Sequence, residues 1–158
     1  MTSLREEIKQ GKPWRSREQE AFLNLLRTAD ALARAEVHLL KRAGLSPKRD
    51  DQATASLPGS WAACHVLYLG DELAVAMGRL IGDGGWYFHV IDMAVLPEHQ
   101  RRGLGSAVLD HLLAEVRRRA PRGAYVNLLA DPPGRQLYAR RGFAETAPEA
   151  IGMGLLLD

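Results

Sequence analysis

The sequence has only one cysteine and almost no excess of either charge. Cys64 alone cannot form an internal disulfide or a multi-cysteine zinc site. We expect it to be a small buried strand residue, in keeping with a reducing compartment. The 21 Lys and Arg residues nearly balance the 19 Asp and Glu residues, which gives a formal charge of +2. This balance does not favour nucleic acid or a membrane surface as the main partner.

Long apolar stretches are also missing. A membrane-spanning helix needs about 18 or more consecutive apolar residues, and the sequence contains no such run. Residues 1–10 lack the apolar centre of an export signal. We therefore predict a cytoplasmic protein that binds neither nucleic acid nor membrane.

The length of 158 residues favours a single domain over 1–158, although the apolar spacing changes near residue 60. Residues 1–56 form a helical N-terminal region, with a long helix predicted over 17–43 that ends at Gly44. A loop with a short helix follows it. If the apolar stripe of the long helix exceeds what the core can cover, it also permits a homodimer.

Residues 57–158 have the shorter apolar spacing of strands, interrupted by two helical segments. Strands are predicted over 61–69, 72–81, 86–95, 124–130 and 151–157. Helices are predicted over 103–119 and 132–141, and tight turns at Gly70–Asp71 and 82–85. The fold class is therefore α/β: a mixed, mostly antiparallel sheet with flanking helices behind an N-terminal helical region.

The stretch HQRRGLGS, residues 99–106, joins a predicted strand to a predicted helix. The first turn of a helix has unpaired N–H groups and the positive end of the helix dipole. Gly103 and Gly105 lack a Cβ, so an anion could approach the backbone, and Arg101 and Arg102 could add charge. These residues alone fit a phosphate-binding loop and a plain tight turn equally well. The spacing matches neither the nucleoside triphosphate loop nor the dinucleotide-binding glycine motif.

Two blocks of sequence resemble the GNAT family of acyltransferases. The segment DMAVLPEHQRRGLGSAVLDHLL resembles the family's acetyl-CoA signature, which Gln100, Gly103 and Gly105 match. A second block, LYARRGF at 137–143, resembles a later motif of the family, after a strand and at the end of a short helix. The resemblance covers about residues 57–158 and implies that this part is a cofactor-binding core.

The resemblance implies acetyl-CoA as co-substrate and a place for it. In this family the strand before the signature and the strand after the next helix splay apart, and the pantetheine arm bonds to the free strand edge. The backbones of Met93 and Val95 would then face that arm. The pyrophosphate would bind a loop made of Gln100, Arg101, Arg102, Gly103, Leu104, Gly105 and Ser106.

Candidate catalytic residues also follow from the resemblance. Tyr138 matches the usual general acid, and a phenol with a pKa near ~10 stays protonated at neutral pH. His89 stands where histone-acetylating members carry a glutamate, and an imidazole titrating near ~6.5 suits a base. Asp92 could hold the amine or a water. A structural role stays open for both, as does a reaction without a single base. Glu98 and His99 are expected to be solvated turn residues.

Asp131 departs from the family pattern, which often has a cofactor-contacting Asn at this place. Because Pro132 and Pro133 follow it, Asp131 also fits a helix N-cap whose carboxylate accepts backbone N–H bonds. The cap is favoured, and the cofactor contact stays open.

Residues 1–47 resemble the N-terminal dimerisation helices of MarR-type winged-helix regulators. No helix-turn-helix or wing follows, so DNA binding is disfavoured. A chimera and a coincidental similarity of Ala-, Leu-, Arg- and Glu-rich helices are both open.

The predicted function is therefore that of an N-acetyltransferase. It would move an acetyl group from acetyl-CoA directly to a primary amine of a small molecule or peptide, in a ternary complex. The alternative is a non-catalytic acyl-CoA-binding or regulatory module.

Overall fold

The computed structural model describes residues 21–23, 29–45, 48–68 and 73–155, and the described strands form one mixed sheet in the order β1-β2-β3-β4-β5. Neighbouring strands are antiparallel except β4 and β5, which are parallel. The strands are β1 (Ala21–Leu23), β2 (Ala62–Tyr68), β3 (Ala76–Gly82), β4 (Tyr87–Val95) and β5 (Tyr125–Leu128). The predicted mixed, mostly antiparallel sheet is confirmed.

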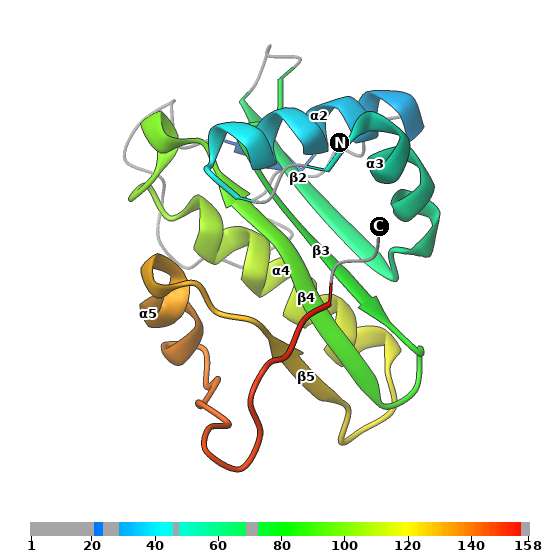
Figure 1. The fold of residues 1–158 in the computed structure, drawn as a ribbon, viewed down its shortest axis with the longest axis vertical. Helices are drawn as coiled ribbons and strands as arrows, with labels where there is room; N and C mark the ends of the chain where they lie inside the picture. The colour runs from blue at the N-terminus through cyan, green and yellow to red at the C-terminus, as the bar shows by residue number, and fades with distance from the viewer. Residues whose placement is uncertain (1–20, 24–28, 46–47, 69–72, 156–158) are drawn as a thin grey trace.

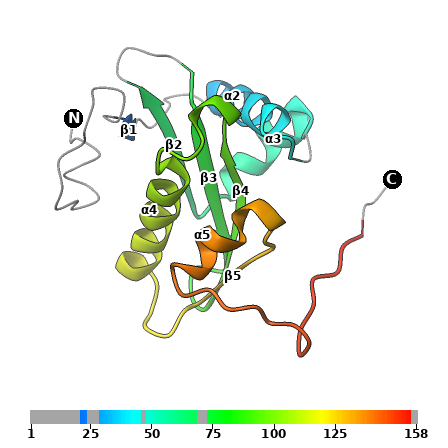
Figure 2. The same ribbon diagram turned by 90° about the vertical axis from the view of Figure 1, so that its left-hand side faces the viewer.

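Helices cover both faces of this sheet. Helices α2 (Ala29–Arg42) and α3 (Asp50–Ser56) lie on one face, and α4 (Leu104–Arg119) lies on the other (Figures 1 and 2). Helix α4 is the crossover between the parallel strands β4 and β5, as predicted. The short helix α5 (Arg135–Ala139) follows β5. None of the helices in the described part of the chain is both long and apolar enough to cross a membrane.

The main core lies between the sheet and α4. Phe88 of β4 and Val108, Leu109 and Leu112 of α4 are 0 % exposed. The α4 residues recur at helical spacing, so they form one apolar stripe, and burying each such side chain contributes roughly 1.5–3 kcal/mol. Cys64 is buried in β2, as expected. This packing fixes the ends of β4 and α4, where the candidate site lies.

The turn between β3 and β4 is organised by one carboxylate. Asp83 Oδ1 accepts backbone N–H bonds from Gly85, Trp86 and Tyr87 at 2.8, 2.9 and 3.1 Å. These bonds favour the charged form and hold the pKa of Asp83 below its ordinary value. The carboxylate thereby sets where β4 begins.

The N-terminal helix prediction is wrong over part of its length. Residues 21–23 form β1, which pairs with β2 from Val66 to Tyr68, whereas α2 begins at Ala29. Pairing satisfies the backbone groups on the outer edge of β2, and such tertiary context overrides a helical pattern. Gly44, with φ +74°, follows the end of α2 as predicted.

The predicted last strand, over 151–157, is also wrong where it can be checked. Residues 151–155 are irregular and exposed, because glycine at 152 and 154 weakens a strand. The predicted turn at Gly70–Asp71 lies outside the described residues. The strand predicted from residue 72 begins at Ala76, and the helix predicted over 132–141 is a 3-10 turn followed by α5.

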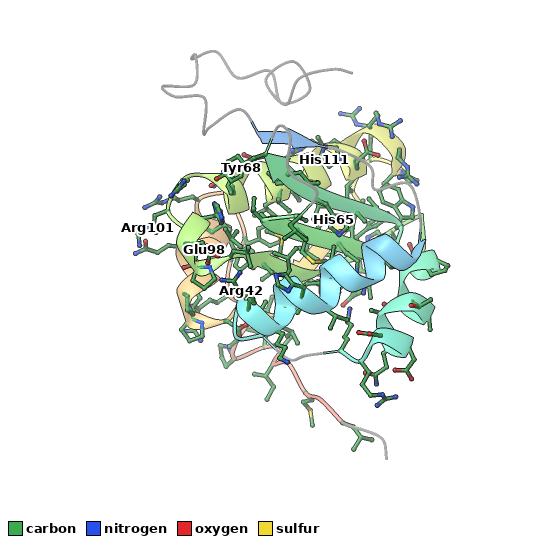
Figure 3. All side chains as sticks on the ribbon, turned by 90° about the horizontal axis from the view of Figure 1, so that it is seen from above. Arg42, His65, Tyr68, Glu98, Arg101 and His111 are labelled. Atoms are coloured by element: carbon green, nitrogen blue, oxygen red, sulfur yellow. The ribbon has the colours of Figure 1, made fainter. Side chains whose placement is uncertain are left out.

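His65 in β2 makes the stability of the protein depend on pH. Its side chain is buried among the strands, its Nε2 has no hydrogen-bond partner within the described residues, and Figure 3 shows its place in the sheet. Burial, together with the charge of Arg79, lowers the pKa of His65 from 6.5 to about 4. The unfolded chain therefore binds the extra proton first as the pH falls.

We expect acid to destabilise the protein through His65. Because the pKa is depressed in the folded state, its contribution is complete above pH 6.5 and is lost as the pH falls towards 4. The free energy of unfolding falls by about 3 kcal/mol at most through this group. In His65→Leu, chemical denaturation between pH 7 and pH 4 should show a shallower loss of stability. Substituting the exposed His38 in the same way should leave the slope of the wild type, and equal slopes in all three proteins would contradict the prediction.

Candidate active site

Strands β4 and β5 separate halfway along β4. They pair only from Tyr87↔Tyr125 to Val90↔Leu128, although β4 continues to Val95. Residues 91–95 therefore have no β5 partner, and this edge of β4 is free to hydrogen-bond another extended molecule. The separation predicted between these strands is present.

The backbone of Val95 faces this gap. Leu96 N–H donates to the Val75 carbonyl at 2.9 Å, on the β3 side. Because N–H groups of successive strand residues point to opposite sides, the Val95 N–H points away from β3. The Val95 carbonyl accepts a bond from Gln100 Nε2 at 3.1 Å. Gln100 thus anchors the following loop to the end of β4.

The loop after β4 leads into a helix start that no side chain caps. Gly103 is the N-cap of α4 with φ +86° and makes no side-chain cap bond; its carbonyl accepts from Ala107 N–H at 3.0 Å. A Cβ at Gly103 would meet nothing within 4 Å, so glycine is needed there for the backbone angle and not for internal packing. The first-turn N–H groups of α4, at Leu104, Gly105 and Ser106, have no intrahelical acceptors. This helix end can bind an anion.

The arginines of the loop add charge at its outer side. Arg101 has φ +62°, a left-handed conformation that is uncommon for a residue with a Cβ. Arg101 and Arg102 are both exposed, and Figure 3 shows Arg101 extending outward from the molecule. No acidic residue lies in the first turn of α4, so the local field at the helix start is positive.

Helix α5 lies against the start of α4. A Cβ at Gly105 would be 3.5 Å from Val95 Cγ2 and 3.5 Å from Leu137 Cδ2, so the three residues converge at the end of β4. Tyr138 follows Leu137 and is partly buried, with its ring 6.1 Å from that of Phe143. Burial, aided by the negative charge of Asp131, raises the pKa of Tyr138 above its ordinary value. The phenol therefore keeps its proton at neutral pH.

Asp131 is at the predicted cap position but does not cap. It precedes the 3-10 turn Pro132–Gly134 and makes no side-chain cap bond; its backbone carbonyl accepts from Gly134 N–H at 2.9 Å. The predicted capping bond from the carboxylate is therefore wrong. The charge acts on Tyr138 instead.

His89 lies on the paired part of β4, on the face opposite α4. Its Nδ1 hydrogen-bonds Oδ1 of Asn127 on β5. Since the amide oxygen can only accept, Nδ1 donates the proton of this bond. His89 and Asp92 thus have different partners, and the sheet does not bring the two candidate bases into one pair.

Asp92 lies in an irregularity of β4 where the gap begins. Between Met77↔Ala94 and Arg79↔Ile91, both Asp92 and Met93 lie opposite Gly78, which is a β-bulge. Asp92 has φ +54°, and a Cβ on Gly78 would come within 2.6 Å of Met93 Sδ. The bulge turns the Met93 side chain towards α4 and the Asp92 carboxylate towards α2 and α3.

Asp92 belongs to a buried ion cluster that joins α2, the loop before α3, β3 and β4. Arg79 Nη2 lies 2.7 Å from Asp92 Oδ2, and Arg79 Nε lies 2.8 Å from Glu36 Oε1. Lys48 Nζ contacts Glu36 Oε1 at 2.9 Å and also Asp92 Oδ2. We call Glu36, Lys48, Arg79 and Asp92 the ion cluster. Glu36, Lys48 and Arg79 were not predicted from the sequence, in which they are 12 or more residues apart.

The pKa values of the two carboxylates in the cluster are shifted in opposite directions. Burial raises the pKa of Glu36 above its ordinary value even though Lys48 and Arg79 oppose the shift. Burial alone would also raise the pKa of Asp92, but hydrogen bonds from Lys48 and Arg79 lower it below its ordinary value. Asp92 is thus the carboxylate that stays charged, and Glu36 is the one that accepts a proton more readily.

Glu98 and His99 lie in the turn beside the loop; Glu98 is exposed as predicted, whereas His99 is half-buried. Glu98 pairs with Arg42 of α2 at 2.7 Å; Figure 3 labels both residues on the same side of the molecule as Arg101. His99 Nδ1 lies 3.0 Å from the Tyr68 hydroxyl. Both contacts tie the turn before the loop to α2 and β2.

The separated strands β4 and β5 and the uncapped start of α4 belong to a mixed α/β fold, and comparisons with known proteins identify its family. The family model of the acetyltransferase (GNAT) domain matches residues 60–145. No curated protein matches the sequence. The chain belongs to the GNAT acetyltransferase family.

Solved structures agree with this assignment. A probable acetyltransferase from meticillin-resistant Staphylococcus aureus is similar, with a TM-score of 0.77 and 29 % identity over 87 % of this chain and 98 % of that one. The ribosomal-protein-S18-alanine N-acetyltransferase of Escherichia coli has a TM-score of 0.65 and 23 % identity, over 80 % and 79 %. A predicted acetyltransferase from Clostridium acetobutylicum, solved with acetyl-CoA, has a TM-score of 0.64 and 17 % identity, over 85 % and 94 %. The last two show likeness of fold alone.

The family model begins at residue 60 and does not reach residues 1–47. The resemblance of that segment to MarR-type helices is not confirmed. Its described part contains the strand β1, which pairs with the same sheet as the rest of the fold.

Proposed function

We propose that this protein is an N-acetyltransferase that transfers an acetyl group from acetyl-CoA directly to a primary amine. The observation that carries the proposal is the free edge of β4 over residues 91–95, next to the uncapped start of α4. An extended pantetheine arm needs the first feature and a pyrophosphate needs the second. We further propose that residues 1–158 act as one domain, with the cofactor held by residues 57–158.

The residues fit the parts of acetyl-CoA in order along the chain. The backbones of Met93 and Val95 would bond the pantetheine arm. The first-turn N–H groups of Leu104, Gly105 and Ser106 would bind the pyrophosphate, with Arg101 and Arg102 as charge partners. Gln100 would act mainly by positioning the loop, since its amide already bonds the Val95 carbonyl. For Asp131 we propose an electrostatic effect on Tyr138 in addition to any cofactor contact.

The chemistry needs a free amine, a polarised carbonyl and a proton for the leaving thiolate. The acceptor ammonium loses one proton to a base, for which His89 and the Asp92 carboxylate are the candidates. The nitrogen then attacks the thioester carbon while a backbone N–H near Val95 supports the developing oxyanion. The C–S bond breaks, and the CoA thiolate takes the proton of Tyr138. The acetylated nitrogen gives up its remaining extra proton, which returns the tyrosinate to the phenol. Holding both reactants in one ternary complex supplies the proximity.

Titration calorimetry tests the cofactor half of this proposal. Acetyl-CoA should bind with one site per chain, and desulfo-CoA should compete for the same site. Absence of binding at millimolar acetyl-CoA would overturn the proposal. A thiol-release assay with a panel of polyamines, aminoglycosides, amino acids and peptides then tests the acceptor half.

Tyr138→Phe should slow turnover without weakening acetyl-CoA binding. The substitution keeps the ring that packs near Phe143 and removes only the proton donor. General acid catalysis contributes about 10²-fold or more, so kcat should fall by about that factor, while calorimetry should give an unchanged Kd. Phe143→Tyr adds a hydroxyl to the neighbouring ring and should leave kcat near the wild-type value. An unchanged kcat in Tyr138→Phe would remove Tyr138 from the reaction.

A further inference from the structure

Lys48 is placed differently from the other cation of the ion cluster. Arg79 is only 2 % exposed and satisfies Glu36, Asp92, the Ser56 carbonyl and the Ser60 hydroxyl from one planar group. Lys48 lies on the irregular segment between α2 and α3, and its side chain is 24 % exposed. Arg79 is therefore built into the core, whereas the Lys48 ammonium enters the cluster from the surface.

One oxygen of the two carboxylates that hold Lys48 has no hydrogen-bond partner within the described part of the chain. Glu36 is 0 % exposed, and its Oε2 has no hydrogen-bond partner among the residues that the structure describes. A buried carboxylate oxygen without a partner is costly. An ammonium with three N–H donors has one more donor than the two contacts that Lys48 makes here. The Glu36–Asp92 pair can thus bind an ammonium group with more bonds than Lys48 makes.

The location of this pair is next to the proposed reaction site. Asp92 immediately precedes Met93, whose backbone would contact the pantetheine arm, and it lies just beyond the last β4–β5 pair at Val90. The Asp92 side chain faces α2 and α3, the side of the sheet opposite α4. An amine held by Glu36 and Asp92 is therefore beside the gap, on the face that α2 and α3 cover, and Lys48 marks the way in from the surface.

Charge counting shows what happens when Lys48 leaves. Two carboxylates and two cations make the cluster neutral. Without Lys48 it carries one net negative charge unless the fully buried Glu36 takes up a proton, which its raised pKa favours. A proton restores the charge balance but not the hydrogen bonds that the ammonium made. A second ammonium is the group that restores both the charge and the hydrogen bonds.

We propose that Glu36 and Asp92 form the ammonium subsite for the acceptor, and that Lys48 occupies this subsite until a primary alkylammonium substrate displaces it. The proposal rests on the proposed function and names its substrate class: unbranched primary alkylamines such as polyamines or lysine side chains, whose aminobutyl end matches that of Lys48. Lys48 thereby competes with weak or poorly fitting amines.

The first experiment measures binding without any turnover. Thermal unfolding of the full-length protein is followed in the presence of n-butylammonium chloride. Tetramethylammonium chloride is the control for the positive charge, and 1-butanol is the control for the alkyl group. Lys48→Met should be less stable than the wild type and should be restored by n-butylammonium alone. If Lys48 fills the subsite about 90 % of the time, its removal lowers the apparent Kd for n-butylammonium about tenfold. Lys41→Met, an exposed lysine of α2, should respond as the wild type does.

The second experiment separates this proposal from the proposed function. With acetyl-CoA and an alkylamine, Lys48→Met should lower KM by a similar factor without lowering kcat. Lys48→Gln keeps a donor for the carboxylates and provides the test if Lys48→Met does not fold. Equal responses of Lys48 and Lys41 variants to n-butylammonium would overturn the subsite. If the Lys48 variants bind n-butylammonium but no variant uses acetyl-CoA, the subsite stands and the proposed transferase activity does not.

Discussion

Arg79→Met is expected to lower the free energy of unfolding by about 3–5 kcal/mol, because it leaves buried carboxylates without their partner. Arg79 is 2 % exposed, and its guanidinium contacts Glu36 at 2.8 Å and Asp92 at 2.7 Å. Methionine fills a similar volume but supplies neither charge nor N–H donors. Lys48 alone cannot neutralise both carboxylates. Urea denaturation of the wild type and the variant measures the difference.

A surface ion pair of this chain provides the matched control. Arg42 and Glu98 are 2.7 Å apart, with side chains 48 % and 46 % exposed. Solvent screens such a pair, so Arg42→Met should leave the midpoint of urea denaturation almost unchanged. Adding Glu36→Gln to Arg79→Met should recover part of the loss by removing one uncompensated charge. Equal losses in the Arg79 and Arg42 variants would show that burial does not set the strength of these pairs.

The ion cluster also shows what could not be predicted from the sequence. Glu36 is in a helical segment, Lys48 in a loop and Arg79 in an apolar strand, so each fits a solvated or snorkelling position when taken alone. Only the packing of α2 over the bulge at Asp92 brings them together. Neither a bulge nor a positive φ at an aspartate leaves a repeated pattern in the sequence.

The strands and helices of the core, in contrast, follow from local pattern. Strands β2 to β4 show the apolar periodicity of strands and are separated by turns that contain glycine. Helix α4 has one apolar stripe whose residues are buried. The failures lie at the two ends of the chain. The strand β1 depends on pairing with β2, and residues 151–155 have an apolar composition but no strand partner among the described residues.

The position of the loop HQRRGLGS, residues 99–106, could be predicted from the sequence, but its internal structure could not. The apolar spacing after residue 103 correctly predicts a helix start there, and the two glycines have different roles. Gly103 provides a backbone angle, with φ +86° and nothing near its missing Cβ. Gly105 lies in ordinary contact range of Val95 and Leu137, so it sets how closely β4, α4 and α5 approach one another. The side-chain bond from Gln100 to Val95 was not predicted.

Gly103→Val is expected to abolish acetyl-CoA binding while the protein still folds. A β-branched residue strongly disfavours φ +86°, so the loop must move the first N–H groups of α4 away from their present direction. Losing two charge-assisted hydrogen bonds to a pyrophosphate costs about 4 kcal/mol, or about 10³-fold in Kd. Calorimetry with acetyl-CoA measures the loss, and circular dichroism confirms that the helices persist.

Gly123→Val separates loss of the site from loss of stability. Gly123 has φ +85°, is exposed and, like Gly103, has nothing within 4 Å of the place that a Cβ would take. It lies between α4 and β5, away from the loop at the start of α4. The two substitutions therefore impose nearly the same backbone strain, about 1–3 kcal/mol, and should lower the unfolding temperature alike. Only the Gly103 variant should lose acetyl-CoA, because only there does the strained angle orient the N–H groups that face the pyrophosphate. If both variants bind acetyl-CoA normally, the stretch HQRRGLGS is a turn, and the anion must be held elsewhere.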